Sequence, residues 1–264
     1  MRAAYDDQLR TEAEMRTATD VQRRGPLWWG RFGQHGFVTY RDLGGLEGAD
    51  LDRLVATTVA HFRDASDVDS FEWKTRGHDV PDDLGERLEA HGLAPEPVET
   101  VMIGEASALA VDVPLAVTPE GPVVVRRVEP GPDAARDLAR MGAVQEEIFG
   151  GGRGPGLESS LADLTSGESE FWLAEVGDRV VCAGRLTPVP GTDFAGIWGG
   201  GTLPGHRGRG IYRAVVAARA RSAVAAGVRW INSDCTDMSR PILERSGLVA
   251  VTTTTPYVWT RRSS

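Results

Sequence analysis

One stretch decides the fold of this chain: Gly199-Gly-Gly-Thr-Leu-Pro-Gly-His-Arg-Gly-Arg-Gly-Ile-Tyr-Arg-Ala-Val-Val216. Residues 194–203 predict a strand, and residues 208–226, rich in Ala, Val and Arg, predict a long helix. The turn between them contains one proline and three glycines. Such a turn exposes several backbone N–H groups at the positive end of a helix dipole. We therefore predict a phosphate-binding turn that holds a phosphorylated molecule mainly through main-chain atoms.

The composition is that of an ordinary globular protein. The chain has 264 residues, 41% hydrophobic and 25% charged, which allows one large domain or two small ones. A net charge of −9 argues against nucleic-acid binding and favours an amine-bearing ligand. Residues 1–20 are polar and no apolar run approaches membrane-spanning length, which predicts no membrane partner and a cytoplasmic location. The two cysteines predict buried free thiols.

The expected elements fall into two halves. Residues 111–122 are proline-rich without a helical period, which predicts a linker between domains at 1–110 and 123–264. Periodicity predicts helices at 6–18, 49–63, 133–149, 157–164 and 240–246, and strands at 26–32, 36–43, 70–75, 98–103, 123–128, 170–175, 179–186 and 230–236, with a final strand pair at 248–261. The glycine-rich run 150–156 predicts a mobile loop. Residues 71–103 and 230–259 share the order strand, helix, Gly-Leu, strand, which suggests an internal repeat.

Three kinds of phosphate loop compete for the turn. A Walker-type loop requires a lysine, and this turn contains none. A dinucleotide-binding loop requires a third glycine where Arg213 stands, and an acidic residue about twenty positions further on that is not found at a strand end. The remaining candidate is Arg207-Gly-Arg-Gly210, which follows a strand of an expected meander.

This segment resembles the acyl-CoA loop of the GCN5-related N-acetyltransferase (GNAT) superfamily, Arg/Gln-x-x-Gly-x-Gly/Ala, with Tyr212 where a small residue is usual. The element order over residues 122–262 is similar to that superfamily, and residues 240–248 resemble its late Leu-Tyr-Glu-Lys-Leu-Gly-Phe segment. The resemblance implies an α/β (α+β) fold with a mixed, mostly antiparallel central sheet flanked by helices. It also implies a tandem arrangement in which residues 1–110 are a degenerate GNAT-like copy.

The resemblance implies acetyl-CoA as co-substrate, an amine as acceptor and no metal. Gly200, Gly201 and Thr202 would lie along the pantetheine arm, where glycines in a strand also indicate a bulge or a close backbone approach. The pyrophosphate would be wrapped by Arg207, Gly208, Arg209, Gly210, Ile211, Tyr212 and Arg213. Ser239, at the start of the late helix, is expected to act either as an N-cap or as a CoA contact.

The first half contains a strand-to-helix turn that corresponds to the glycine turn at 204–210, but its charged side chains are acidic. Residues 42–50 contain glycines, but their ionisable side chains are Asp42, Glu47 and Asp50. Carboxylates repel a pyrophosphate. We therefore expect the first half to bind no CoA and to act as a structural element or as a wall of the acceptor cleft.

Acetyl transfer to an amine requires an oxyanion donor, a base for the ammonium and an acid for the leaving thiolate. The resemblance implies direct attack on the thioester, with a backbone N–H near residues 200–202 as oxyanion donor. Candidates for the base are Glu146, its neighbour Glu147, and Asp234, each with a solvated or ion-paired role as the alternative. Leu243 occupies the place of the superfamily's usual leaving-group tyrosine, so Tyr212 is a substitute acid, with packing or a CoA contact as its alternative.

The sequence therefore predicts an acetyl-CoA-dependent N-acetyltransferase that acts on a primary amine of a small molecule or peptide, as a monomer or homodimer. The alternative is a non-catalytic acyl-CoA-binding or regulatory protein, which Leu243 and the lack of a distinctive base suggest.

Overall fold

The computed structural model describes residues 1–65, 67–115, 117–150 and 156–261. Contacts between Cα atoms divide the chain into two compact units. Unit 1 comprises Met1–Met102, Asp234–Arg240 and Ala250–Ser264, and unit 2 comprises Ile103–Ser233 and Pro241–Val249. Most of the expected mobile loop, residues 151–155, lies outside the described residues.

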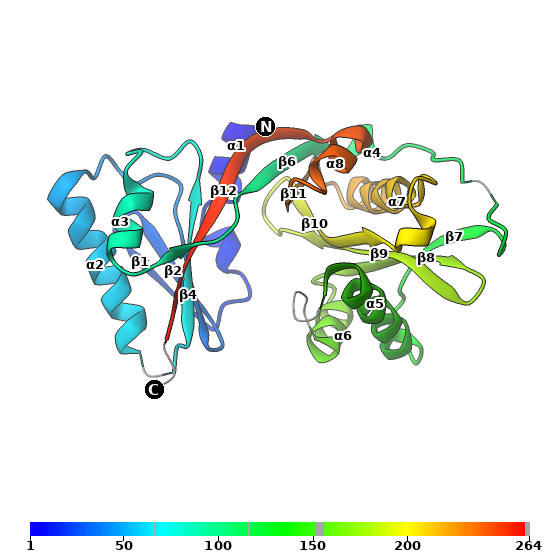
Figure 1. Ribbon diagram of the computed structural model, residues 1–264, viewed down its shortest axis with the longest axis horizontal. Helices are drawn as coiled ribbons and strands as arrows, with labels where there is room; N and C mark the ends of the chain where they lie inside the picture. Colours follow the sequence, from blue (N-terminus) through cyan, green and yellow to red (C-terminus); the bar gives the residue numbers. More distant parts are fainter. Residues whose placement is uncertain (66, 116, 151–155, 262–264) are drawn as a thin grey trace. The chain divides into compact units, whose positions relative to one another are not determined.

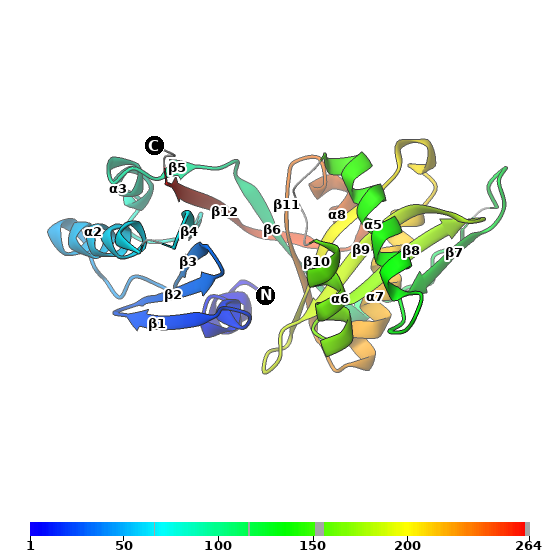
Figure 2. The same ribbon diagram turned by 90° about the horizontal axis from the view of Figure 1, so that it is seen from below.

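Unit 1 is a sheet with α2 and α3 on one face and α1 and η1 on the other (Figures 1 and 2). Its helices are α1 (Arg2–Gln8), the 3₁₀ helix η1 (Glu12–Met15), α2 (Gly48–Asp64) and α3 (Leu84–Ala90). Its strands are β1 (Asp20–Arg24), β2 (Leu27–Phe32), β3 (His35–Thr39), β4 (Ser70–Arg76) and β5 (Ala94–Pro95). Strands β1 to β3 form an antiparallel meander, and β4 runs parallel to β3. The apolar face of α2 is buried against Phe71 and Trp73 of β4, as the helical spacing predicted.

Unit 2 is a sheet between two helical layers. Its helices are α4 (Ala106–Leu109), α5 (Ala134–Phe149), α6 (Leu157–Ser166), the 3₁₀ helix η2 (Pro204–His206), α7 (Ile211–Ala225) and α8 (Arg240–Ser246). Its strands are β7 (Val123–Arg127), β8 (Glu170–Val176), β9 (Arg179–Pro188), β10 (Phe194–Thr202) and the first part of β11 (Trp230–Cys235). Strands β7 to β10 are antiparallel neighbours, and β11 runs parallel to β10. Helices α5 and α6 cover one face and α7 the other (Figures 1 and 2).

The last strands differ from the expected boundaries. The prediction of a strand pair at 248–261 was wrong, because this segment is the single strand β12 (Val249–Thr260). It pairs antiparallel with β4 of unit 1, from Thr254 opposite Arg76 to Thr260 opposite Ser70. Strand β6 (Glu99–Glu105) ends in unit 2, where the N–H of Ala106 donates to the carbonyl oxygen of Arg229 over 2.8 Å. A strand's alternation predicts that it pairs but carries no information on its partner.

The expected fold class is confirmed, since unit 2 has a mostly antiparallel sheet flanked by helices. Two local predictions were wrong, and one strand was missed. Residues 6–18 contain two short helical segments rather than one helix, and β1 was not predicted. Helix α7 begins at Ile211 rather than residue 208, because Gly208 and Gly210 have φ angles of +75° and +76°, in the left-handed region that no helix interior adopts.

Candidate functional site

Strand β10 is irregular where it approaches the turn. It pairs with β11 over Phe194–Gly196, and its register against β9 shifts between Trp198 and Gly201. Gly199 lies in this shift with φ +58°, a left-handed conformation that favours glycine. The predicted bulge is therefore confirmed.

The three glycines of the bulge let side chains approach the backbone from both faces. A Cβ atom on Gly200 would lie 2.9 Å from the Tyr212 ring of α7, and one on Gly201 would lie 3.0 Å from Ile148 of α5. A Cβ atom on Gly199 would collide with the amide of Gln145, whose Nε2 donates to the Gly199 carbonyl oxygen over 2.8 Å. Close packing of α5 and α7 thus requires these glycines independently of any ligand.

The turn after β10 presents backbone donors beside exposed cations. Gly210 caps α7 in the left-handed conformation and, as a glycine, provides no side-chain acceptor at this cap. The first N–H groups of a helix have no acceptor within the helix, so those of Ile211, Tyr212 and Arg213 face the turn. The side chain of Ile211 is buried, so its only possible contribution to an anion site is its N–H. Arg207, Arg209 and Arg213 are exposed, and Nε of Arg207 donates to the Thr202 carbonyl oxygen over 3.0 Å.

The segment expected to be a linker packs against this turn within unit 2. A Cβ atom on Gly210 would lie 3.7 Å from Val113 and 3.9 Å from Leu115. A hydrogen bond from its own backbone N–H and one from Thr118 lower the pKa of the Glu120 carboxyl, and the charges of His206 and Arg209 add to this effect. The sequence did not indicate this packing, because a proline-rich stretch has no period that predicts a contact.

Arg219, a buried neighbour of Tyr212 on α7, was missed by the sequence analysis. The Arg219 side chain is 0% exposed, and its Nη1 donates to the Arg185 carbonyl oxygen over 3.0 Å. Burial lowers the pKa of Arg219, and the neighbouring Tyr212 hydroxyl and Cys182 thiol oppose this shift. Burial also raises the pKa of Cys182 to about 11, which leaves its thiol protonated at neutral pH. The only sequence signal for this residue was its position on the side of α7 that faces the sheet.

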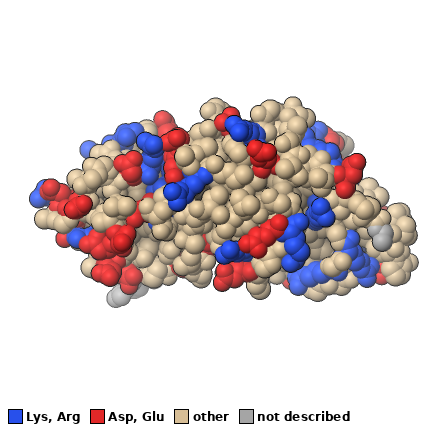
Figure 3. All heavy atoms as spheres, turned by 90° about the horizontal axis from the view of Figure 1, so that it is seen from above, with Lys and Arg blue, Asp and Glu red and all other residues tan. Residues whose placement is uncertain are grey.

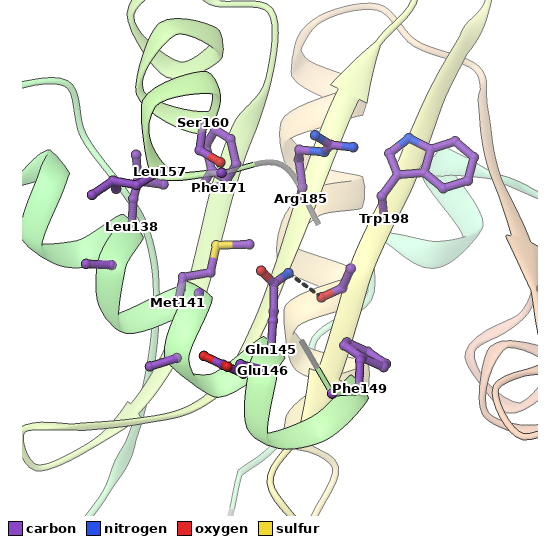
Figure 4. A pocket seen from close by; sticks show the side chains of 16 residues that line it. Leu138, Met141, Gln145, Glu146, Phe149, Leu157, Ser160, Phe171, Arg185 and Trp198 are labelled. Carbon is purple, nitrogen blue, oxygen red and sulfur yellow. Dashed lines mark hydrogen bonds between the residues drawn. The ribbon is translucent and has the colours of Figure 1, made fainter. Parts of the chain in front are cut away.

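A pocket of about 540 Å³ opens on the opposite face of β10, between the α5–α6 layer and the sheet (Figure 4). Phe171, Arg185 and Trp198 lie opposite one another on β8, β9 and β10, so their side chains share one face. Figure 4 shows the Arg185 guanidinium between the two aromatic rings. Apolar side chains of Leu138, Met141, Phe149 and Leu157 complete much of the lining.

The predicted catalytic residues occupy different places. Glu146 lines the pocket and is exposed, and in Figure 4 its carboxylate points away from Trp198. Tyr212 lies on the α7 face of β10, and Glu146 lies on α5, which covers the other face. The adjacent Gln145, which the sequence argument did not single out, is the residue that reaches the bulge.

Asp234 and Ser239 belong to unit 1. The Asp234 side chain is 7% exposed and accepts a hydrogen bond from Nζ of Lys74 over 2.6 Å. Burial lowers the pKa of Lys74, but the Asp234 carboxylate and Glu14 more than offset this effect, so that the net shift is upward. The N–H of Ser239 donates to the Thr236 carbonyl oxygen over 2.9 Å. Asp234 is therefore ion-paired within a largely buried cluster of charged side chains that includes Lys74 and Glu14.

The surface is not uniformly acidic. Figure 3 shows basic side chains gathered over part of unit 2, although the chain carries a net charge of −9. In the described ranges, no three or more His, Cys, Asp or Glu side chains are grouped to hold a metal ion. No helix in that same part of the chain is long and apolar enough to cross a membrane.

Comparison with known proteins supports the same class of fold. Residues 143–241 match the model of the acetyltransferase (GNAT) family. A GCN5-related N-acetyltransferase from Kribbella flavida superposes with a TM-score of 0.70 at 16% identity, over 99% of this chain and 95% of that one. One from Sphaerobacter thermophilus gives 0.64 at 18% identity, over 90% and 78% of the two chains. A tandem GNAT protein from the clavulanic acid biosynthesis pathway gives 0.60 at 14% identity, over 90% and 79%. No curated protein is similar enough in sequence to count as a relative.

Proposed function

We propose that this protein transfers an acetyl group from acetyl-CoA to a primary amine bound in the pocket beside β10. The match of residues 143–241 to the model of the acetyltransferase (GNAT) family supports this proposal. The observation that carries the proposal is the bulge of β10, which runs directly into the turn at the N-terminus of α7, beside the exposed side chains of Arg207 and Arg209. Both features lie in one unit, and the pocket of about 540 Å³ adjoins the bulge at Trp198 and Gly199.

In this proposal the turn holds the pyrophosphate of CoA. Backbone N–H groups at the start of α7 bind phosphate oxygens, and the positive end of the helix dipole favours their charge. Arg207 and Arg209 add exposed positive charge. Residues 200–202 of β10 lie along the pantetheine arm, and a backbone N–H among them stabilises the oxyanion.

The proposed chemistry is direct transfer. The amine nitrogen attacks the thioester carbonyl carbon, the carbon–sulfur bond breaks, and the electron pair leaves on sulfur. Glu146, the one carboxylate among the described lining residues, accepts the proton that the amine loses, after its exposed side chain turns toward the acceptor. Tyr212 supplies a proton to the thiolate, and its ring contact with Gly200 supports a place beside the same strand.

We propose that unit 1 binds no CoA. In the matching turn the Gly44 N–H donates to the Asp42 carboxylate over 2.9 Å, so an internal anion already uses a donor that a phosphate would need. The buried Asp234–Lys74 pair supports a structural role for Asp234. A cytoplasmic location and a monomeric or homodimeric state stay predictions.

Release of free CoA thiol over a panel of amines tests the activity. We expect release above background hydrolysis with at least one amine. Tight acetyl-CoA binding without such release would instead support the alternative, a non-catalytic acyl-CoA-binding or regulatory protein.

The variant Gly210→Glu tests the cofactor site. A carboxylate at the proposed pyrophosphate position should weaken acetyl-CoA binding by about 100-fold or more, through repulsion and loss of the left-handed cap. Gly44→Glu, at the matching turn of unit 1, is the control and should leave acetyl-CoA affinity unchanged. Unchanged affinity of the Gly210 variant would refute the proposed CoA site.

A further inference from the structure

Arg185 gives the pocket a chemical preference that the proposed function does not specify. It lies on β9 in the middle of the aromatic row, with Phe171 opposite it on one side and Trp198 on the other. Its side chain is 24% exposed, so most of the side chain is withdrawn from water. Among the described residues its ion-pair partner is Asp163 of α6, at 3.9 Å.

This environment leaves the charge of Arg185 poorly compensated. Burial lowers the pKa of its guanidinium, and Asp163 opposes that shift only in part. Asp163 itself is 28% exposed and is not among the residues that line the pocket. Withdrawing a charge from water costs free energy unless a close counter-ion and hydrogen bonds replace the hydration. The guanidinium therefore has hydrogen-bonding capacity that faces the pocket.

We propose that Arg185 binds a carboxylate of the acceptor, so that the substrates are amino acids or closely related amines that carry a carboxylate and an apolar side chain. This inference rests on the proposed function and names its substrate class. A guanidinium presents two parallel N–H groups that match a carboxylate, and such charge-assisted bonds are the strong ones in proteins.

The rest of the lining suits the remaining parts of such a molecule. Leu138, Met141 and Leu157 offer apolar surface to a side chain. Glu146 lies on α5, a different wall from Arg185 on β9, so an ammonium and a carboxylate of one ligand have separate partners. The preference thus differs from the one suggested by net charge alone, which favoured any amine.

Compounds that differ only at the carboxylate test its contribution to substrate preference. Phenylalanine, leucine and methionine are each compared with their carboxamide and their decarboxylated amine, by thiol release with acetyl-CoA. We expect kcat/KM for the acids to exceed that for the carboxamides and amines by about 10- to 100-fold, the range for hydrogen bonds to a charged group. Equal or better use of the decarboxylated amines would overturn the proposal.

Two variants assign the preference to this residue. Arg185→Met removes the charge at similar length and should bring the acids down to the level of the carboxamides, while Arg185→Lys should retain part of the preference. Arg179→Met is the matched control, because Arg179 is exposed on the same strand, about 20 Å away, and does not line the pocket. Acetyl-CoA affinity should be unchanged in all three. An equal loss for acids, carboxamides and amines in the Arg185 variants would contradict carboxylate recognition.

A binding measurement distinguishes failure of this inference from failure of the proposed function. Titration calorimetry with N-acetylphenylalanine and its carboxamide needs no turnover. If no amine is acetylated but the wild-type protein binds the acid at least 10-fold more tightly, and Arg185→Met abolishes the difference, then the carboxylate site stands and the enzyme proposal fails. Equal binding of the acid and the carboxamide overturns the carboxylate site whether or not the protein is an enzyme.

Discussion

Gln145 of α5 donates a hydrogen bond from Nε2 to the carbonyl oxygen of Gly199 in β10 over 2.8 Å. This contact ties the helix that lines the pocket to the one residue of the bulge with a left-handed backbone, φ +58°. A hydrogen bond from outside the strand therefore supports a bulge that the glycines allow locally. The proposed oxyanion donor lies within the next three residues, so its orientation depends on this amide.

The first prediction concerns the bulge. Gly199→Ala combines backbone strain with a collision against Gln145, so it should lower the free energy of unfolding by about 2 kcal/mol or more. Gly177→Ala is the control, because Gly177 also has a positive φ, +56°, but no atom within 4 Å of its Cβ position. Urea denaturation should show the larger loss for Gly199. Equal losses would mean that the contact with Gln145 contributes nothing.

The second prediction concerns the base. Glu146→Gln should lower kcat by about 100-fold or more, the usual contribution of a positioned general base. The affinity for acetyl-CoA should stay the same, because Glu146 is not part of the turn. Glu147→Gln is a matched control, since Glu147 is also exposed on α5 but does not line the pocket. Similar kinetics for both variants would exclude Glu146 as the base.

The third prediction concerns Tyr212. Tyr212→Phe keeps the ring against Gly200 and removes only the hydroxyl, so acetyl-CoA affinity should not change. If the hydroxyl protonates the leaving thiolate, kcat should fall by about 10-fold, less than for a typical acid because a thiolate is a good leaving group. The same variant leaves the buried Arg219 without its phenol neighbour and should lower the free energy of unfolding by about 1 kcal/mol. A loss of stability with unchanged kcat would assign Tyr212 to packing.

The fourth prediction concerns the ion pair in unit 1. Asp234→Asn leaves the ammonium of Lys74 buried without its closest counter-ion and should lower the free energy of unfolding by about 3 kcal/mol. The raised pKa of Lys74 sets the pH range. A group whose pKa rises on folding contributes its full stabilisation below its unfolded pKa, so the loss should be constant between about pH 6 and 9 and diminish above about pH 10.5.

Kinetics of the same variant test the other reading of Asp234. If Asp234 is structural, the folded Asp234→Asn protein should retain kcat at a temperature well below its unfolding midpoint. A fall in kcat of about 100-fold in the fully folded variant would favour Asp234 as the base instead.

Local features of the fold could be read directly from the residues. The spacing of apolar residues predicted α2 and α5 to within a residue or two at each end. The glycines of 199–201 predicted the bulge, and Gly208 and Gly210 marked the turn before α7. Each of these depends on interactions between residues close in sequence, where propensity and backbone conformation decide the outcome.

The features that needed the tertiary structure all depend on residues distant in sequence. The sequence predicted a strand pair at 248–261, whereas the folded chain shows one strand that pairs with β4, because strand pairing is selected by burial and not by local pattern. The Asp234–Lys74 pair and the row of Phe171, Arg185 and Trp198 arise in the same way. The sequence by itself determined the glycine turn before α7 and the class of fold around it. The tertiary structure decided which side chains meet beside that turn, because side chains on neighbouring strands become neighbours only when the register is set.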